Sequence, residues 1–366
     1  MDKEVDAFED LFREIEDHSL IDDPRFLDDE QLIRTEQLEL LGAVFNNNVR
    51  DVELKHLTQH FRPMFRDCHP IHLVIWGKTG TGKTLTVAYF IQMMMELSKR
   101  KQIPIRYTYL DLATPKSCFR ALNDLACLLN ASRRYKKGTS LEAMMGSIED
   151  SLANYHGYFV LSVDEVNHVR TEWDVFSPFL IWRLPQAIPS KLVLVMTSNR
   201  IDWTSNLNPR VRSFLRADEI LFRPYNALDI QQILKIRTRR ALRPNALQAG
   251  VIEKISALAS REHGDARKAV TLLARAARLA ERSGSKITLK LVDQAGSDLE
   301  QDRYILMMRT SPVQLQATMA GVVDAWTNRK KASLNTGDVY DAHPRQIARH
   351  RHARSVSLLD GPKVRP

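Results

Sequence analysis

Short apolar runs alternate with longer amphipathic segments between Ile71 and Tyr225. This alternation is typical of a parallel sheet that helices cover on both faces, because strands buried on both sides are apolar throughout. The predicted strands are IHLVIW from Ile71, IRYTYLDL from Ile105, YFVLSV from Tyr158, KLVLVMTS from Lys191 and EILFRPY from Glu219. The pattern therefore predicts an α/β domain that ends at Tyr225, and the family resemblance described below extends its predicted bounds to residues 33–225.

The β pattern stops after Tyr225, and helical periodicity takes over. The predicted helices are LDIQQILKIRTRRAL, LQAGVIEKISALASREH, DARKAVTLLARAARLAERSG and ITLKLVDQAGSDLEQD. We therefore predict a small helical domain over residues 226–303. A third, smaller domain is predicted over residues 304–366, where Pro312 lies near the start of another helix.

Composition and charge change this picture mainly at the two ends. The chain has 366 residues, of which 44% are hydrophobic and 27% charged, and its net charge of +9 permits a polyanionic partner. Residues 1–32 are strongly acidic and predict either a solvated arm or an arm that competes with DNA for basic surface. The sequence has neither a secretory signal nor an apolar run long enough to cross a membrane, so we expect a cytoplasmic protein without a membrane partner.

A phosphate-binding motif follows the first predicted strand. The segment GKTGTGKT matches G-x-x-x-x-G-K-[ST] between that strand and the helical run TLTVAYFIQMMMEL. Its glycines allow a tight turn whose N–H groups face a phosphate, Lys83 neutralises phosphate charge, and Thr84 offers a hydroxyl to Mg²⁺. We therefore predict that ATP or ADP is bound by Gly77, Lys78, Thr79, Gly80, Thr81, Gly82, Lys83, Thr84 and Leu85.

Polar residues at the ends of two later strands extend this site. FVLSVDEV places Asp164 and Glu165 at a strand end, where Asp164 is expected to hold Mg²⁺ and Glu165 to orient or deprotonate an attacking water. TSNR ends the next strand, and Asn199 can polarise the same water, although an Asn after a strand is also a common turn residue. These positions predict an enzyme that hydrolyses ATP to ADP and phosphate.

The motifs and their order resemble the archaeal initiator family that is related to the largest origin-recognition-complex subunit and to the cell-division-cycle loader protein. The resemblance covers about Ile33 to Asp324 through IRTEQLELL, LVIWGKTGTGKT, LSVDEV, TSNR, NLNPRVRSFL, FRPYNALDIQQILKIR and GDARKA. It implies an α/β fold with an AAA+ P-loop parallel sheet and a helical lid. A winged-helix-like C-terminal domain, here shortened, is expected to follow.

The resemblance also implies roles for single residues. Asn199 is similar to the sensor 1 residue, and Arg267 in GDARKA is similar to the sensor 2 arginine of the lid. Arg210 is similar to the finger arginine that a neighbouring subunit offers, with Arg212 as an alternative. Arginine suits these roles because its planar guanidinium matches phosphate oxygens, but Arg210 and Arg267 could also be ordinary surface residues.

The resemblance extends to the adenine-contacting region, and the chain differs from the family at one position beside the proposed base. Tyr225, with the segment around Arg34, Glu36 and Gln37, resembles the adenine-contacting region. Asn167 stands where the family commonly has a second acidic residue, which puts the rate of hydrolysis in question.

Two basic segments are predicted DNA contacts. The loop SRRYKKG follows the second strand, where similar initiators carry a DNA-contacting insertion, and it contains Arg133, Arg134, Lys136 and Lys137. In the tail, Arg345, Arg349 and Arg351 recur at helical spacing and could face phosphates. Each segment could instead be a solvated basic surface.

The sequence thus predicts an ATP-dependent replication initiator that is associated with the nucleoid. It is expected to bind double-stranded origin DNA, to self-associate on it, and to help recruit or load the replicative helicase, with slow ATP hydrolysis as a conformational switch. Two alternatives stay open: an AAA+ ATPase of a transposition or defence system, and a DNA-binding module with a nearly static bound nucleotide, which Asn167 favours.

Overall fold

The computed structural model describes residues 19–28, 34–47, 49–114, 117–129, 135–136, 138–168, 178–262 and 264–329. The chain divides into two compact units between Val292 and Asp293. The first unit contains a sheet with its covering helices and a group of lid helices. The second contains most of α13 (Leu289–Thr310) and α14 (Val313–Arg329).

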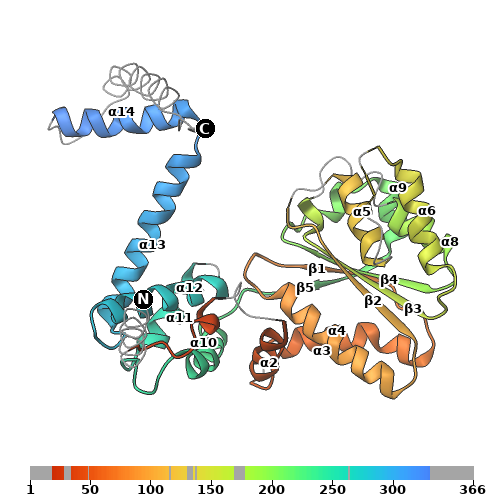
Figure 1. Cartoon of the computed structure of the whole chain (residues 1–366), viewed down its shortest axis with the longest axis horizontal. Coiled ribbons are helices and arrows are strands. Elements are labelled where there is room, and N and C mark those ends of the chain that lie inside the picture. Colours follow the sequence, from red (N-terminus) through yellow and green to blue (C-terminus); the bar gives the residue numbers. More distant parts are fainter. Residues whose placement is uncertain are drawn as a thin grey trace, which may run out of the picture. The chain divides into compact units, whose positions relative to one another are not determined.

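Five parallel strands form one sheet in the order β2-β3-β4-β1-β5 (Figure 1). They are β1 (His72–Trp76), β2 (Ile105–Asp111), β3 (Tyr158–Asp164), β4 (Lys191–Ser198) and β5 (Ala217–Leu221). The central strands β3 and β4 are buried at almost every position, as expected for strands between two helical layers. All five predicted strands are confirmed, although β5 begins at Ala217 rather than at Glu219 and ends at Leu221 rather than at Tyr225.

Helices cover both faces of the sheet (Figure 1). One face carries α3 (Asp51–Phe61), η2 (Arg62–Arg66) and α4 (Lys83–Arg100), and α2 (Arg34–Phe45) packs on α4 and on α10 (Ala227–Ala241). The other carries α5 (Cys118–Leu129), α6 (Leu141–Leu152), the π-helix η4 (Phe179–Arg183), α8 (Leu184–Ala187) and α9 (Pro209–Leu215). Short 3-10 turns, η3 (Val166–His168) and η5 (Thr204–Asn206), follow β3 and β4.

The two cores follow from the alternation of side chains along each strand. In β3, Phe159, Leu161 and Val163 belong to the core that contains α5 and α6. Tyr158 and Val160 belong to the core that contains α3 and α4. Because successive strand residues point to opposite faces, an apolar strand can fill both cores at once.

The lid consists of α10 (Ala227–Ala241), α11 (Val251–Arg261) and α12 (Ala266–Arg282). A capping box starts α10, because the Asn226 side chain accepts the N–H of Asp229 while the Asp229 carboxylate accepts the N–H of Asn226. Asp265 caps α12 by accepting the N–H of Arg267 at 2.9 Å. These caps place the start of α12 at the GDARKA motif.

The N-terminal segment differs from the prediction of a solvated arm. Residues 19–28, which include η1 (Pro24–Leu27), pack on the lid, where Phe26 and Leu27 are buried. Ile21 forms a bridge with Leu242, and Arg237 donates to the Phe26 carbonyl at 3.1 Å. Two apolar side chains among the acidic residues thus anchor this part of the segment. Residues 1–18 and 29–32 lie outside the described residues.

Two long helices follow the lid. α13 is continuous from Leu289 to Thr310 and passes through residue 304, where we predicted the start of a third domain. α14 begins just after Pro312, as the sequence suggested. Residues 330–366, which include most of the expected winged-helix-like domain, lie outside the described residues. No helix in the described part of the chain is both long enough and apolar enough to cross a membrane.

His72, the first residue of β1, is expected to make stability depend on pH. Its Nδ1 accepts the N–H of Leu194 at 3.2 Å. Burial, with smaller effects of His69 and His60, lowers its pKa from 6.5 to about 4. Because the folded state resists protonation, this stability is present above pH 6.5 and is lost as the pH falls towards 4, by at most about 3 kcal/mol.

Urea unfolding at neutral pH and at about pH 4.5 measures this loss. Other groups also titrate in this range, so the control is His72→Asn, whose amide oxygen can accept the same N–H without titrating. The variant should lose less stability than the wild type on acidification. Equal losses in the two proteins would show that His72 does not carry the effect.

Candidate nucleotide site

The loop between β1 and α4 has the backbone of a phosphate-binding loop. Gly80 and Gly82 adopt φ values of 76° and 77°, which residues with side chains rarely adopt. A Cβ at Gly82 would collide with the Tyr225 hydroxyl, and one at Gly80 with the Asp265 carboxylate. Glycine is thus required both by the loop conformation and by the close approach of these two side chains. The loop ends at the first residues of α4, whose free N–H groups favour a bound anion.

Lys83 points its charge back into this loop. Its Nζ donates to the carbonyls of Gly77 at 2.8 Å and Lys78 at 3.0 Å. Burial lowers the pKa of the ammonium, while Glu165 and Asp164 oppose this effect. The loop therefore contains an ammonium group bonded to backbone carbonyls, which suits the binding of a phosphate group.

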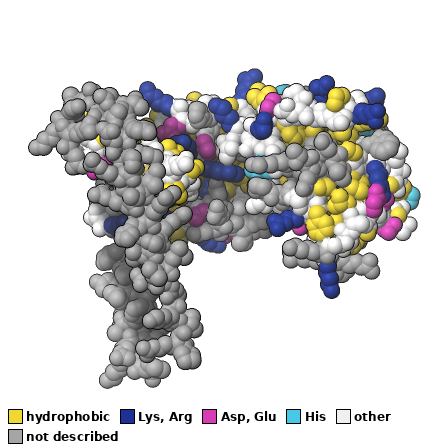
Figure 2. Space-filling model, turned by 90° about the horizontal axis from the view of Figure 1, so that it is seen from above, with side chains coloured by type: hydrophobic (Ala, Val, Ile, Leu, Met, Phe, Trp, Pro, Cys, Tyr) yellow, Lys and Arg dark blue, Asp and Glu magenta, His cyan; other side chains and the backbone are white. Residues whose placement is uncertain are grey.

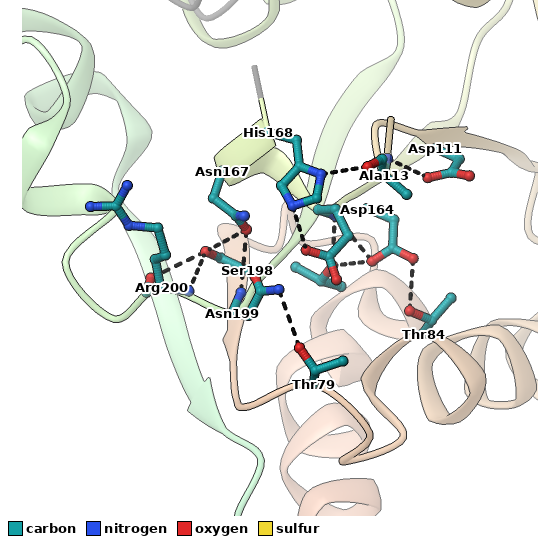
Figure 3. A network of polar contacts seen from close by, with 12 residues as sticks. Thr79, Thr84, Asp111, Ala113, Asp164, Asn167, His168, Ser198, Asn199 and Arg200 are labelled. Atoms are coloured by element: carbon teal, nitrogen blue, oxygen red, sulfur yellow. Dashed lines mark hydrogen bonds and ion pairs between the residues drawn. The ribbon is translucent and has the colours of Figure 1, made fainter. Parts of the chain in front are cut away.

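Asp164, the last residue of β3, accepts hydrogen bonds from three neighbouring elements, of which Figure 3 shows the bond from Thr84. Thr84 of α4 donates its hydroxyl to Oδ2 at 2.7 Å, and Tyr109 of β2 donates to the same oxygen at 2.8 Å. Thr197 of β4 donates to Oδ1. The predicted pair of Thr84 and Asp164 is thus brought together as an oxygen-rich donor set, which fits the preference of Mg²⁺ for oxygen ligands.

Glu165 has the surroundings of a general base. Its backbone is left-handed, with φ of 55°, and its N–H donates to the Thr197 hydroxyl at 3.1 Å. The side-chain Oε2 is buried without a hydrogen-bond partner, and His168 Nε2 lies 3.8 Å from it. Burial and, secondarily, Asp164 raise the pKa of Glu165, against the opposing charge of Lys83. A carboxylate with a raised pKa and an unused oxygen is suited to accept a proton.

Asn199 lies just beyond the end of β4 and faces the phosphate-binding loop (Figure 3). Its Nδ2 is 3.5 Å from the Thr79 hydroxyl, and its Oδ1 is buried without a hydrogen-bond partner. Glu165 and Asn199 thus each keep a buried oxygen unused in the site, although buried oxygens are normally hydrogen-bonded. This arrangement fits two groups that together orient a water.

The lid contributes residues from the start of α12. The N–H of Ala266 donates to the Gly80 carbonyl at 3.3 Å. The exposed Arg267 acts electrostatically on both Lys83 and Glu165, lowering the pKa of each. The predicted sensor 2 arginine therefore lies within electrostatic reach of the loop and of the proposed base.

Tyr225, a predicted contact of the adenine, places its hydroxyl against Gly82 of the loop at the junction between sheet and lid. The structure adds Arg50, whose guanidinium lies 3.9 Å from the centre of the Tyr225 ring. Arg50 also donates to the carbonyls of Thr81 at 2.8 Å and Arg223 at 2.7 Å, and it pairs with Glu53 at 2.7 Å. This buried arginine links the loop to the junction before the lid.

Sequence reasoning missed Arg50, Tyr109 and Thr197. The latter two had a detectable signal, because each carries a hydroxyl near the end of a predicted strand. Arg50 had none, since it occupies an irregular turn before α3 in which no motif marks a buried charge.

Other predicted site residues lie apart from this network. Arg210 and Arg212 are exposed on α9. Lys136 is exposed, whereas the other predicted DNA contacts lie outside the described residues: Arg133, Arg134, Lys137, Arg345, Arg349 and Arg351. Arg34 begins α2, the helix that also contains Glu36 and Gln37.

Two family models match the chain: an AAA domain over residues 68–202 and the Cdc6 AAA+ ATPase-type lid domain over residues 231–297. An ORC1-type DNA replication protein of Desulfurococcus amylolyticus is 30% identical over 296 residues, which cover 80% of this chain and 74% of that protein. The chain belongs to the ORC1-type DNA replication protein family.

A further relative and a solved structure support this family assignment. An ORC1-type protein of Pyrococcus furiosus is 30% identical over 302 residues, which cover 80% of this chain and 70% of that protein. The solved structure of Aeropyrum pernix ORC1 in complex with DNA is similar with a TM-score of 0.66 and 26% identity, over 81% of this chain and 76% of that one. The predicted family and the AAA+ fold with its lid are confirmed, and the match gives no support to the transposition or defence alternative.

Lys83→Ala is expected to lower the affinity for ATP by about a hundredfold or more, because backbone donors alone cannot supply the lost charge. Titration with a fluorescent ATP analogue measures the affinity. The matched control is Lys99→Ala, which removes an exposed lysine from the last turn of the same helix and should bind like the wild type. Wild-type affinity in Lys83→Ala would remove the loop from the nucleotide site.

Proposed function

We propose that this ORC1-type protein binds origin DNA and uses slow ATP hydrolysis as a conformational switch. The observation that carries the ATPase proposal is the grouping of Thr84, Asp164, Glu165 and Asn199 beside a glycine-dependent loop. These residues come from α4 and from the ends of adjacent strands β3 and β4. The grouping contains an oxygen pair for Mg²⁺, a base and an amide, and Lys83 of the loop adds the positive charge for phosphate.

In the proposed reaction, each residue has one task. Lys83 binds the phosphate oxygens, and Thr84 with Asp164 would hold Mg²⁺, which supplies additional positive charge when bound. Glu165 accepts a proton from the attacking water while Asn199 orients that water. Tyr109 and Thr197 keep Asp164 in place through their hydroxyls. Burial and the adjacent Asp164 raise the pKa of Tyr109, so its hydroxyl stays protonated as a donor.

The switch is proposed from the contact between the lid and the loop. Ala266 donates to Gly80, so α12 begins at the edge of the phosphate-binding loop. Arg267 is positioned to respond to the charge of a γ-phosphate, because it already influences Lys83 and Glu165. Loss of that phosphate on hydrolysis would weaken this attraction and loosen the lid. Arg210, exposed on α9, would complete the site of a neighbouring copy on DNA.

DNA binding is proposed from the family and from the two basic segments. Aeropyrum pernix ORC1, a structural relative, is known in complex with DNA. On the face of the described residues seen in Figure 2, Lys and Arg side chains are scattered with Asp and Glu rather than gathered in one patch. The segments proposed to contact DNA are the loop around Lys136 and the tail. Recruitment of the replicative helicase, and a location at the nucleoid, belong to the same proposal.

Glu165→Gln tests the ATPase proposal. It should keep ATP bound within about twofold while lowering turnover by about a hundredfold or more, since the amide preserves shape but cannot accept the proton. Phosphate release and ATP titration measure the two properties. Glu142→Gln, in the first turn of α6, is the control and should behave like the wild type. Unchanged turnover in Glu165→Gln would exclude Glu165 as the base, and a wild type without turnover would favour the static-nucleotide alternative.

The tail is tested by a variant in which Arg345, Arg349 and Arg351 are all changed to Ala. If each contacts a phosphate, the slope of log affinity against log salt should shrink by roughly one per arginine, for origin and random duplexes alike. ATP affinity should not change. A wild-type slope would show that the tail is a solvated surface, and Lys136→Ala would then test the loop as the place of contact.

A further inference from the structure

Asn167 lies in η3, two residues after the proposed base Glu165. We propose that Asn167 is a positioning residue for Asn199, so that it fixes the amide that orients the attacking water. This inference rests on the ATPase function proposed above, and it assigns a task to the residue that had put hydrolysis in question.

The contacts of Asn167 run to the end of β4 (Figure 3). Its Oδ1 accepts the backbone N–H of Asn199 at 3.3 Å and the hydroxyl of Ser198 at 3.1 Å. A backbone N–H can only donate, so the Asn167 atom that faces it must be the amide oxygen. The Ser198 hydroxyl has a second acceptor in the Arg200 carbonyl at 3.1 Å. Whichever acceptor the Ser198 hydroxyl uses, the hydrogen bond from the Asn199 N–H to Asn167 remains.

The position of Asn199 explains why such a link is needed. Strand β4 pairs with β1 up to Ser198, which lies opposite Trp76, and Asn199 is the first residue beyond this pairing. The strand ladder therefore does not hold Asn199, and its amide must reach Thr79 from an irregular turn. Through its hydrogen bond to Asn199, Asn167 connects this turn to the turn that carries Glu165. The same residue therefore helps to position the orienting amide relative to the base.

The acceptor oxygen of Asn167 is what the proposed role requires. An aspartate at position 167 could accept the same two hydrogen bonds, because its carboxylate also carries acceptor oxygens. Alanine and leucine have no side-chain acceptor, so they would leave the Asn199 N–H without this partner. Aspartate is therefore the conservative substitution with which these two are compared.

A double-mutant cycle distinguishes positioning from a general structural role. Asn167→Ala should lower kcat by about tenfold and leave ATP affinity within about twofold, because the lost bond acts on orientation rather than on binding. In an Asn199→Ala background the same change should have little further effect on kcat. A structural role would instead lower kcat by the same factor in both backgrounds, and that result would overturn the proposal.

A readout independent of turnover is hydrogen exchange of the peptide that contains Ser198 and Asn199. Asn167→Ala should exchange faster there by about tenfold, whereas Asn167→Asp, which keeps an acceptor oxygen, should retain protection and most of kcat. Asn206→Ala is the control, since Asn206 bonds Asp202 in the exposed η5 turn. Asn167→Leu, which removes the acceptor at similar volume, replaces Asn167→Ala if that variant is unstable.

The outcomes separate the inference from the function on which it rests. Wild-type kcat and wild-type exchange in Asn167→Ala would overturn the positioning role and leave the ATPase proposal intact. A wild type that hydrolyses no ATP would overturn the proposed function, and exchange at Asn199 would then still decide whether Asn167 holds this turn.

Discussion

The buried carboxylate of Asp164 is the group on which the candidate site depends. It is 5% exposed at the end of the central strand β3, and a buried charge is costly unless hydrogen bonds compensate for lost water. Donors come from α4, β2 and β4, the three elements that must be in register for the site to form. The hydrogen bonds that compensate the buried carboxylate therefore form only when the strands are aligned and Thr84 is in place.

The contacts around the phosphate-binding loop extend this requirement to the lid. Arg50 bonds the Thr81 carbonyl of the loop and the Arg223 carbonyl before the lid, with the Tyr225 ring against its guanidinium. On the other side of the loop, the backbone of Ala266 reaches Gly80. Movement of the lid would therefore be transmitted to the loop through two sets of contacts, those of the buried Arg50 and those at the start of α12.

Much of this arrangement was predictable from the sequence. Continuous apolar runs identified the five strands, and the spacing of GKTGTGKT, SVDEV and TSNR placed Lys83, Asp164 and Asn199 at one edge of the sheet. Contacts between distant turns were not predictable, because the pairing of Asn167 with Ser198 depends on two loops with no common periodicity. The packing of Phe26 on the lid was missed for a related reason, since acidic neighbours dominate the local composition.

That packing has a consequence for synthesis on the ribosome. Phe26 is bonded through its carbonyl to Arg237, which is 211 residues further along the chain. At about 5–20 residues per second, on the order of 10–40 s pass between the translation of the two residues. Phe26 and Leu27 therefore leave the ribosome long before the lid helices that bury them. During this interval the nearby aspartates keep the nascent N-terminus charged, which opposes its aggregation.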